Sequence, residues 1–286
     1  MAQVQEGRQA ALPAALETER PKGTTSFGSA SLGRLKEAAR ILAPFGVLAV
    51  IWWVIKASFD ISDNVLVSPW AVITATVELV RVGILTDFIG LSIQRLGGAT
   101  LIAVFTAVPI GIVLGLNKNV ATAFEPFFRF LQNVSGIAWL PLAVVWYGLS
   151  NTTILLVIIY TLTLPLGFNT MLGIKTVPPR YAQMCNSLGA SRLRVLRDVY
   201  IPGALPNIIV GFRLGIGYGW RALIAGEMLA AQGGLGDMIF QARTANLIDQ
   251  IMAGMIVIGC LYLVMDRLIL QPIEDVTVGR WGVLRS

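Results

Sequence analysis

Apolar runs long enough to cross a lipid bilayer recur along this sequence, and they limit the fold more than any other feature. A transmembrane helix needs about 20 predominantly apolar residues. Only 13% of the residues are charged, whereas soluble domains carry about 25%, so most of the surface is expected to face lipid. We predict an all-α membrane protein with six transmembrane helices, at residues 41–59, 91–116, 127–149, 153–174, 205–231 and 250–270.

Residues 68–82 have a different pattern from the predicted spans. Ser68 suits the cap of a helix and Pro69 suits its first position. Four apolar side chains recur at spacings of three and four and share one face: Trp70, Ile73, Val77 and Val80. Because the segment is too polar to span, we predict an amphipathic helix that lies at the periplasmic membrane interface.

Lysine and arginine are distributed unevenly between the predicted loops, which orients the chain. With the N-terminus inside the cell, the outer segments hold only Arg81 and Arg243. We therefore predict a multi-pass protein of the bacterial inner membrane with both termini in the cytoplasm. This placement requires six spans. The expected domains are a disordered cytoplasmic tail (1–34), a transmembrane domain (35–272, with a cytoplasmic loop at 175–202) and a cytoplasmic C-terminal tail (273–286).

The sequence lacks the residues that several kinds of chemistry require. There is no histidine and there are two cysteines, Cys185 and Cys260, so neither histidine catalysis nor a zinc site is expected. No phosphate-binding loop of the form GxxxxGK[ST] occurs. We expect no catalytic residue, metal or cofactor on this chain, so any energy input must come from an ion gradient or from another subunit. Basic cytoplasmic loops and contact with anionic lipid explain the net charge of +6, and no nucleic-acid partner is expected.

Prolines and glycines inside the predicted spans indicate bends and close packing. Pro109, Pro141 and Pro165 each fall within a span, where a break is either a kink for packing or a bend that shapes a pathway. Small residues four apart let helices approach closely, and the fifth span carries such a row: Gly211, Gly215 and Gly219. We interpret this row as a packing surface, within one chain or across a dimer.

Charged and aromatic residues inside the spans are candidates for a translocation pathway, because an intramembrane charge is costly and usually functional. The candidates are Arg95, Trp139, Arg213, Trp220, Arg221 and Glu227. For the charged residues the alternative is a buried ion pair or a position at the interface, and for the tryptophans it is core packing. An arginine such as Arg221 in a dry passage would offset the desolvation of an anion.

The polar stretch at residues 177–206 reads VPPRYAQMCNSLGASRLRVLRDVYIPGALP and is predicted to be ordered. The two prolines at its start can open a helix, which Gly189 can end in a left-handed conformation. Ser191 can cap a second helix, and Pro202 and Pro206 are expected to stop it before the fifth span. Two short helices with a glycine corner would form a rigid knob suited to docking, whereas the alternative is a basic loop that only contacts lipid.

This stretch resembles the cytoplasmic loop of ABC importer permeases, whose motif is E-A-A-x3-G-x9-I-x-L-P. Gly189 takes the place of the motif glycine, Val199 that of the first isoleucine, and Ile201 and Pro202 that of the final pair. Gln183-Met184-Cys185 stands where the family has E-A-A. Nearly the whole chain after Leu35 resembles the nitrate, sulfonate, taurine and bicarbonate group of these permeases, through features that include Ser92-Ile93-Gln94-Arg95, Ala138-Trp139-Leu140-Pro141 and Gly226-Glu227-Met228.

The resemblance implies the type I ABC importer permease fold and a homodimer of six-span subunits. Two cytoplasmic ATPase subunits, which hold ATP and magnesium, would dock on the loops, and an extracytoplasmic binding protein would deliver the substrate. The residues implied in coupling to the ATPase form a short coupling helix and the proline that follows it: Ser187, Leu188, Gly189, Ala190, Ser191, Arg192 and Pro202. Relatives of this kind handle sulfonates such as taurine, nitrate, bicarbonate and some neutral heterocyclic or aromatic compounds. We favour a small sulfonate or a related oxyanion.

An ion-coupled secondary transporter or channel is the alternative function. Such proteins often show inverted repeats and carboxylates near the middle of the membrane, and neither is clear in this sequence. A purely structural membrane anchor is a third possibility, against which the ordered loop and the prolines in the spans count. Copurification of an ATPase would discriminate the importer subunit from the self-sufficient transporter.

Overall fold

The computed structural model describes residues 27–59, 61–63 and 65–280, and the regular elements within these ranges are helical. The chain divides after Ile55 into two compact units. In the first unit, the described residues belong to α1 (Phe27–Phe59), which contains Pro44. Because α1 begins at Phe27, it includes the last part of the tail predicted to be disordered. Residues 1–26 of that prediction lie outside the described residues.

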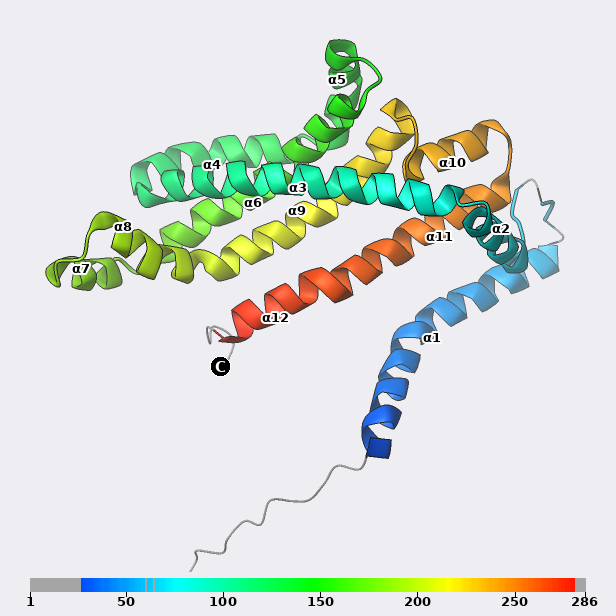
Figure 1. The fold of residues 1–286 in the computed structure, drawn as a ribbon, viewed down its shortest axis with the longest axis horizontal. Helices are drawn as coiled ribbons and strands as arrows, with labels where there is room; N and C mark the ends of the chain where they lie inside the picture. Colours follow the sequence, from blue (N-terminus) through cyan, green and yellow to red (C-terminus); the bar gives the residue numbers. More distant parts are fainter. Residues whose placement is uncertain (1–26, 60, 64, 281–286) are drawn as a thin grey trace, which may run out of the picture. The chain divides into compact units, whose positions relative to one another are not determined.

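Three long helices form the centre of the second unit: α3 (Ile84–Leu116), α6 (Asn151–Thr176) and α9 (Ile201–Ala230) (Figure 1). Helix α6 packs along both of the others, which touch each other only briefly. In its most apolar stretch 56% of α6 is buried, against 28% for α3. Helix α6 is therefore the central helix of this unit, and the sites described below are built around it.

Glycines bring α6 close to its two neighbours. A Cβ atom on Gly111 of α3 would lie 2.6 Å from a backbone oxygen of α6, and one on Gly219 of α9 would lie 2.9 Å from Leu162 of α6. Gly211 and Gly215 of α9 also face α6. The glycine row predicted in the fifth span therefore packs against another helix of the same chain, which confirms its interpretation as a packing surface.

The predicted third span, residues 127–149, is wrong as a continuous helix. The chain instead forms α4 (Lys118–Asn133), the 3₁₀ turn η1 (Gly136–Trp139) and α5 (Leu140–Tyr147), and the two arms are bent by 75°. Non-helical backbone at Val134 and Ser135 ends α4. Pro141 lies in the first turn of α5, where the missing N–H of a proline is tolerated.

The segment between α7 (Pro179–Ser187) and the end of α9 also differs from its prediction. Helix α8 (Arg192–Val195) passes through a π-helical turn, η2 (Leu196–Tyr200), directly into α9, so that Arg192–Ala230 forms one helical segment of 39 residues. The prediction that Pro202 and Pro206 stop the second helix is wrong. Pro202 lies in the first turn after η2, and the π turn shifts the hydrogen-bond register where the chain meets a residue without an N–H.

The remaining helices lie around this centre. Helix α2 (Pro69–Arg81) confirms the helix predicted at 68–82, because Ser68 Oγ accepts a hydrogen bond from the Ala71 N–H at 3.2 Å. Helix α10 (Leu235–Thr244) adds to the predicted elements. Helix α11 (Ile248–Met265) continues through the π turn η3 (Asp266–Leu270) into α12 (Gln271–Arg280). The predicted C-terminal tail is therefore helical up to Arg280, and residues 281–286 lie outside the described residues.

Within the described ranges, four helical segments are long and apolar enough to cross a membrane, or five if α4 and α5 count as one broken span. The four are Ile84–Leu116, Asn151–Thr176, Arg192–Ala230 and Ile248–Asp275. The predicted first span corresponds to a shorter apolar helix, Ala43–Phe59. The all-helical membrane fold is confirmed, and the count of six spans stays a prediction.

Candidate functional site

The corner between α7 and α8, residues 187–192, is a turn rather than the coupling helix expected from the family resemblance. Helix α7 ends at Ser187, and Gly189 follows with φ of 79°, a left-handed conformation that glycine adopts without the strain of a Cβ atom. Ser191 Oγ then accepts a hydrogen bond from the Arg194 N–H at 3.4 Å and caps α8. The predicted roles of Gly189 as a helix end and of Ser191 as a helix cap are confirmed.

Two large apolar side chains are exposed here, one in the corner and one in the first turn of α8. Leu188 is 86% exposed and Leu193 is 75% exposed. Ala182 of α7 and Val195 of α8 are buried, so the two helices are anchored while the corner itself is uncovered. Exposed arginines accompany the leucines: Arg180, Arg192 and Arg194. Large exposed apolar side chains next to basic ones are typical of a contact with another protein.

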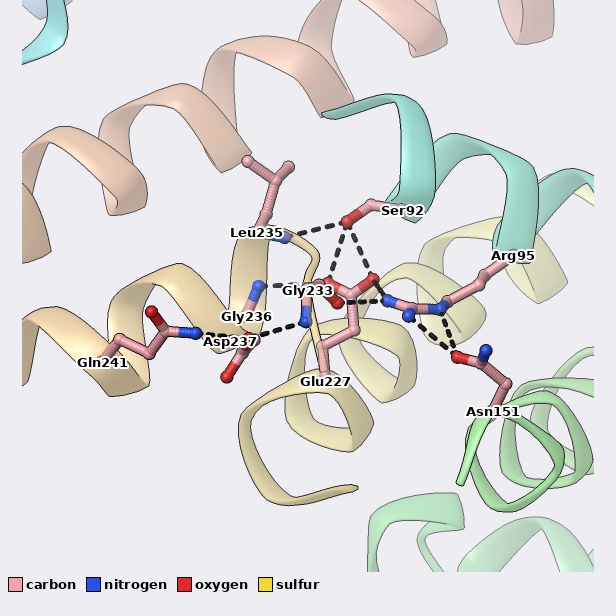
Figure 2. Close-up of polar contacts among 9 residues, drawn as sticks. All are labelled: Ser92, Arg95, Asn151, Glu227, Gly233, Leu235, Gly236, Asp237 and Gln241. Carbon is pink, nitrogen blue, oxygen red and sulfur yellow. Dashed lines mark hydrogen bonds and ion pairs between the residues drawn. The ribbon is translucent and has the colours of Figure 1, made fainter. Parts of the chain in front are cut away.

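A buried network of hydrogen bonds joins α3, α6, α9 and α10 (Figure 2). At its centre the Glu227 carboxylate, which is 0% exposed, pairs with Arg95, which is 8% exposed, and Arg95 Nη1 lies 2.8 Å from Glu227 Oε1. Ser92 Oγ lies 2.8 and 2.9 Å from the two carboxylate oxygens, and the Gly236 N–H donates to Oε2 at 3.0 Å. Arg95 also donates twice to Asn151 Oδ1, at 3.1 and 2.8 Å. We call this set the buried ion-pair network.

The connection between α9 and α10 closes the network with its backbone. Arg95 Nη1 donates to the Gly233 carbonyl oxygen at 2.6 Å, and a backbone N–H of α10 donates to Ser92 Oγ at 3.0 Å. Gly234 has φ of 117°, and a Cβ atom there would lie 2.4 Å from a Glu227 carboxylate oxygen, so both backbone and space require glycine. The two pathway candidates Arg95 and Glu227 thus lie together in a buried ion pair, the alternative considered for them.

Arg213 and Trp220, two further pathway candidates, face the C-terminal helices. Arg213 Nη2 lies 3.0 and 3.1 Å from the two carboxylate oxygens of Asp266, and its Nη1 pairs with Glu274. Trp220 is 5% exposed, and the centre of its ring lies 6.3 Å from that of Tyr262. Arg213 therefore links α9 to η3 and α12, and Trp220 packs on α11.

Trp139 lies at the end of η1, where the chain bends between α4 and α5. Its ring centre is 5.6 Å from that of Tyr160 in α6, and its indole Nε1 is buried with no hydrogen-bond partner among the described residues. At the other end of η1, a Cβ atom on Gly136 would lie 1.9 Å from Thr161 Oγ1 of α6. Contacts with α6 therefore determine where the chain bends.

An open cavity of about 590 Å³ lies where α4, η1, α6 and α9 meet. Its described lining residues include two arginines, Arg129 of α4 and Arg221 of α9, and no carboxylate. The Arg221 guanidinium lies over the Tyr218 ring, 5.6 Å from its centre. The Arg129 guanidinium lies 5.4 Å from the centre of the Phe168 ring, and Nη2 lies 2.9 Å from Glu125. Arg221 is the one predicted pathway residue that this cavity contains.

Arg129 is absent from the candidates predicted from the sequence. It falls within the run of apolar residues assigned to a continuous third span, whereas the structure places it on α4, which has a polar face. Two local signals mark this helix. Asn117 caps it, since its side chain accepts from backbone N–H groups of the first turn, and Glu125 and Arg129 stand at i, i+4.

Comparison with known proteins places the chain among transport proteins. The family model described as "Binding-protein-dependent transport system inner membrane component" matches residues 107–269. The chain is 32% identical to the taurine transport system permease protein TauC of Escherichia coli, over 79% of its own length and 84% of that protein. It is also 32% identical to the nitrate import permease protein NrtB of Synechocystis sp., over 78% and 83% of the two chains. The bicarbonate transport system permease protein CmpB of Synechococcus elongatus is 32% identical over 62% and 64%. The matched region includes the α7–α8 corner, the cavity and Glu227.

Proposed function

The chain belongs to the family of binding-protein-dependent transport system inner membrane components, and on this premise we propose that it is the permease subunit of an ATP-driven importer. Two copies of the chain form the translocation pathway across the bacterial inner membrane, with both termini in the cytoplasm. Two ATPase subunits, which hold ATP and magnesium, bind on the cytoplasmic side. An extracytoplasmic binding protein delivers the substrate.

The α7–α8 corner is the observation that carries this proposal. It presents Leu188 and Leu193 to solvent on a turn that Gly189 and Ser191 make rigid. Buried apolar anchors surrounded by polar contacts supply most of the energy of protein interfaces. The corner therefore suits a groove in a cytoplasmic ATPase, with the two leucines inserted and the neighbouring arginines at the rim.

The segment Arg192–Ala230 connects this docking corner to the interior of the bundle. It begins at the corner, lines the cavity through Arg221 and ends beside the buried ion-pair network at Glu227. A rigid-body displacement of the corner by the ATPase would therefore move the wall of the cavity. Such displacements of packed helices are a common basis of alternating access.

The substrate that we propose is a small sulfonate or a related oxyanion. The names of the relatives refer to taurine, nitrate and bicarbonate. Nitrate and bicarbonate are small oxyanions, and taurine carries a sulfonate group. Arg221 in the cavity supports an anionic rather than a neutral substrate, because a guanidinium offsets the desolvation of an oxyanion.

Purification of the chain from its native membrane in mild detergent, followed by native mass spectrometry, tests the assembly. We expect two copies of this chain with two ATPase subunits. The variants Leu188→Asp and Leu193→Asp should lose the ATPase, whereas Leu247→Asp, an exposed leucine between α10 and α11, should retain it. A complex without ATPase, from membranes in which transport persists, would instead favour the ion-coupled transporter.

A further inference from the structure

Arg221 differs from the other arginines of α3 and α9 in having no carboxylate partner among the described residues. Arg95 pairs with Glu227, and Arg213 pairs with both Asp266 and Glu274. Arg221, by contrast, contacts the Tyr218 ring and makes no ion pair with any described residue. A charge within a membrane helix is costly unless it is paired or lines a water-filled cavity. The cavity is therefore the place where the charge of Arg221 can be balanced.

The second arginine of the cavity is only partly neutralised. Glu125 accepts hydrogen bonds from Arg129, and its other oxygen lies 3.2 Å from Lys175 Nζ. One carboxylate thus serves two cations, which leaves an excess of positive charge on this wall. A smaller cavity of about 230 Å³ that Arg221 also lines contains Glu274, but the carboxylate of Glu274 is already engaged by Arg213.

Two hydroxyl groups on the cavity wall already donate to backbone carbonyls, so the two guanidinium groups are the cationic donors that an anion would meet there. Tyr160 donates its hydroxyl hydrogen to the Leu131 carbonyl at 3.0 Å, and Thr161 donates to the Val157 carbonyl at 2.7 Å. These two hydroxyls are then left with acceptor positions. A guanidinium offers planar pairs of N–H groups, which match two oxygens of an oxyanion better than they match a spherical halide.

The size and the apolar part of the wall point to more than an inorganic ion. About 590 Å³ lies within the range of about 300–1,000 Å³ that is typical of sites for organic ligands. Phe168, Tyr218 and Ile137 line the cavity beside the arginines. An organic group would remove this apolar surface from water, whereas nitrate or bicarbonate would make little use of it.

We propose that this cavity is a binding site for a small organic oxyanion, with the anionic head between Arg129 and Arg221 and the organic part against Phe168 and Tyr218. The proposal rests on the proposed import function for how the ligand reaches the cavity. It adds that the permease itself selects organic oxyanions over inorganic ones. Delivery by a binding protein requires that the site release its ligand, so we expect millimolar rather than nanomolar affinity.

Equilibrium binding to the purified permease–ATPase complex in lipid nanodiscs tests this site, with radiolabelled ethanesulfonate as the probe. We expect saturable binding that nitrate, bicarbonate and chloride displace only at about tenfold higher concentration or more. Arg221→Gln should weaken binding by about tenfold or more, the loss expected for a hydrogen-bonded charge pair, and Arg129→Gln should weaken it by a smaller factor. Arg221→Lys should recover part of the affinity, and Arg243→Gln, on the exposed side of α10, should bind as the wild type does.

Three results would overturn the site: no saturable binding to the wild type, equal binding to Arg221→Gln, or equal affinity for nitrate and ethanesulfonate. Retention of the ATPase by each variant shows that the variant has folded. Uptake into vesicles, measured with the binding protein and ATP, separates the two proposals. If the wild type shows uptake but no binding, only the internal site is overturned. If the wild type neither associates with an ATPase nor supports ATP-driven uptake, the importer function is overturned.

Discussion

Glu227 is a carboxylate without exposed surface in a long apolar helix, and its neighbours explain how it is accommodated. Its two oxygens receive hydrogen bonds from Arg95, from Ser92 and from the backbone N–H of Gly236. A buried ion pair contributes little net stability when complete, but removal of one partner leaves an uncompensated charge. Loss of either residue alone is therefore expected to destabilise the packing of α3 against α9.

Replacement of Arg95 by methionine should destabilise the protein by about 3–5 kcal/mol, because Glu227 would remain buried without a cation. The double variant Arg95→Met, Glu227→Gln should be more stable than the single variant. Reversible unfolding in bicelles measures both, and Arg243→Met should differ from the wild type by about 0.5 kcal/mol or less. A single variant as stable as the wild type would mean that the network is dispensable.

At this scale the sequence identifies the unusual residues but not their partners. Arg95 and Glu227 stand out because each is a charge in an apolar run. Their pairing is not visible, since 132 positions separate them and only the packing of α3 against α9 brings them together. Asn151 gives no signal at all, because a single asparagine at a helix start usually indicates a cap. Arg129 was not predicted because the run of residues that contains it was assigned to a continuous span.

Among the helices, the broken segment α4–η1–α5 shows why a run of apolar residues is not always a span. The run at 127–149 is apolar enough to cross a membrane, yet α4 begins earlier, at Lys118, and ends at Asn133. The bend follows from tertiary contact, since Gly136 fits against Thr161 of α6. By contrast, local signals were sufficient for α2, α7 and the Gly189 corner, where caps, prolines and glycine act within a few residues.

Gly136→Ala should disturb the bend, because its Cβ atom would lie 1.9 Å from Thr161 Oγ1. We expect a loss of about 1–3 kcal/mol, typical of an overpacked site. Thr161→Ala removes that oxygen, so the double variant should regain most of the stability lost by Gly136→Ala. Thermal unfolding of the four proteins in one detergent measures the coupling. Additive effects of the two substitutions would show that this contact does not position the bend.

For the molecule as a whole, one helical segment runs through the regions to which we assign functions. Arg192–Ala230 starts at the docking corner and carries Arg221 and Glu227 in its last third. The sequence predicts the end points of this arrangement but not its continuity, since Pro202 and Pro206 are ordinarily breaks. The π turn η2 is what allows the helix to continue.

Insertion of two glycines after Tyr200 should uncouple the corner from the cavity, because glycine relaxes the backbone of a helix. The complex should still bind and hydrolyse ATP, while ATP-driven uptake falls by roughly tenfold or more if transport depends on rigid-body transmission. The same insertion after Asn246, in the connection between α10 and α11, serves as the control. Normal uptake by the Tyr200 insertion would show that transmission follows another route.

The bend between α4 and α5 also bears on how the chain enters the membrane during synthesis. The backbone at Val134 and Ser135 leaves the regular helical hydrogen-bond pattern, and irregular backbone is tolerated at membrane depth only where protein or water covers it. Much of that cover comes from α6, which contacts the bend through Tyr160 and Thr161 and leaves the ribosome later. Residues 118–147 therefore cannot settle one after another like simple spans. Their final packing requires α6, so we expect them to remain near the translocon or at the interface until α6 is made. Insertion of this region is then cooperative. A nascent chain that stops before α6 would be recognised by quality control.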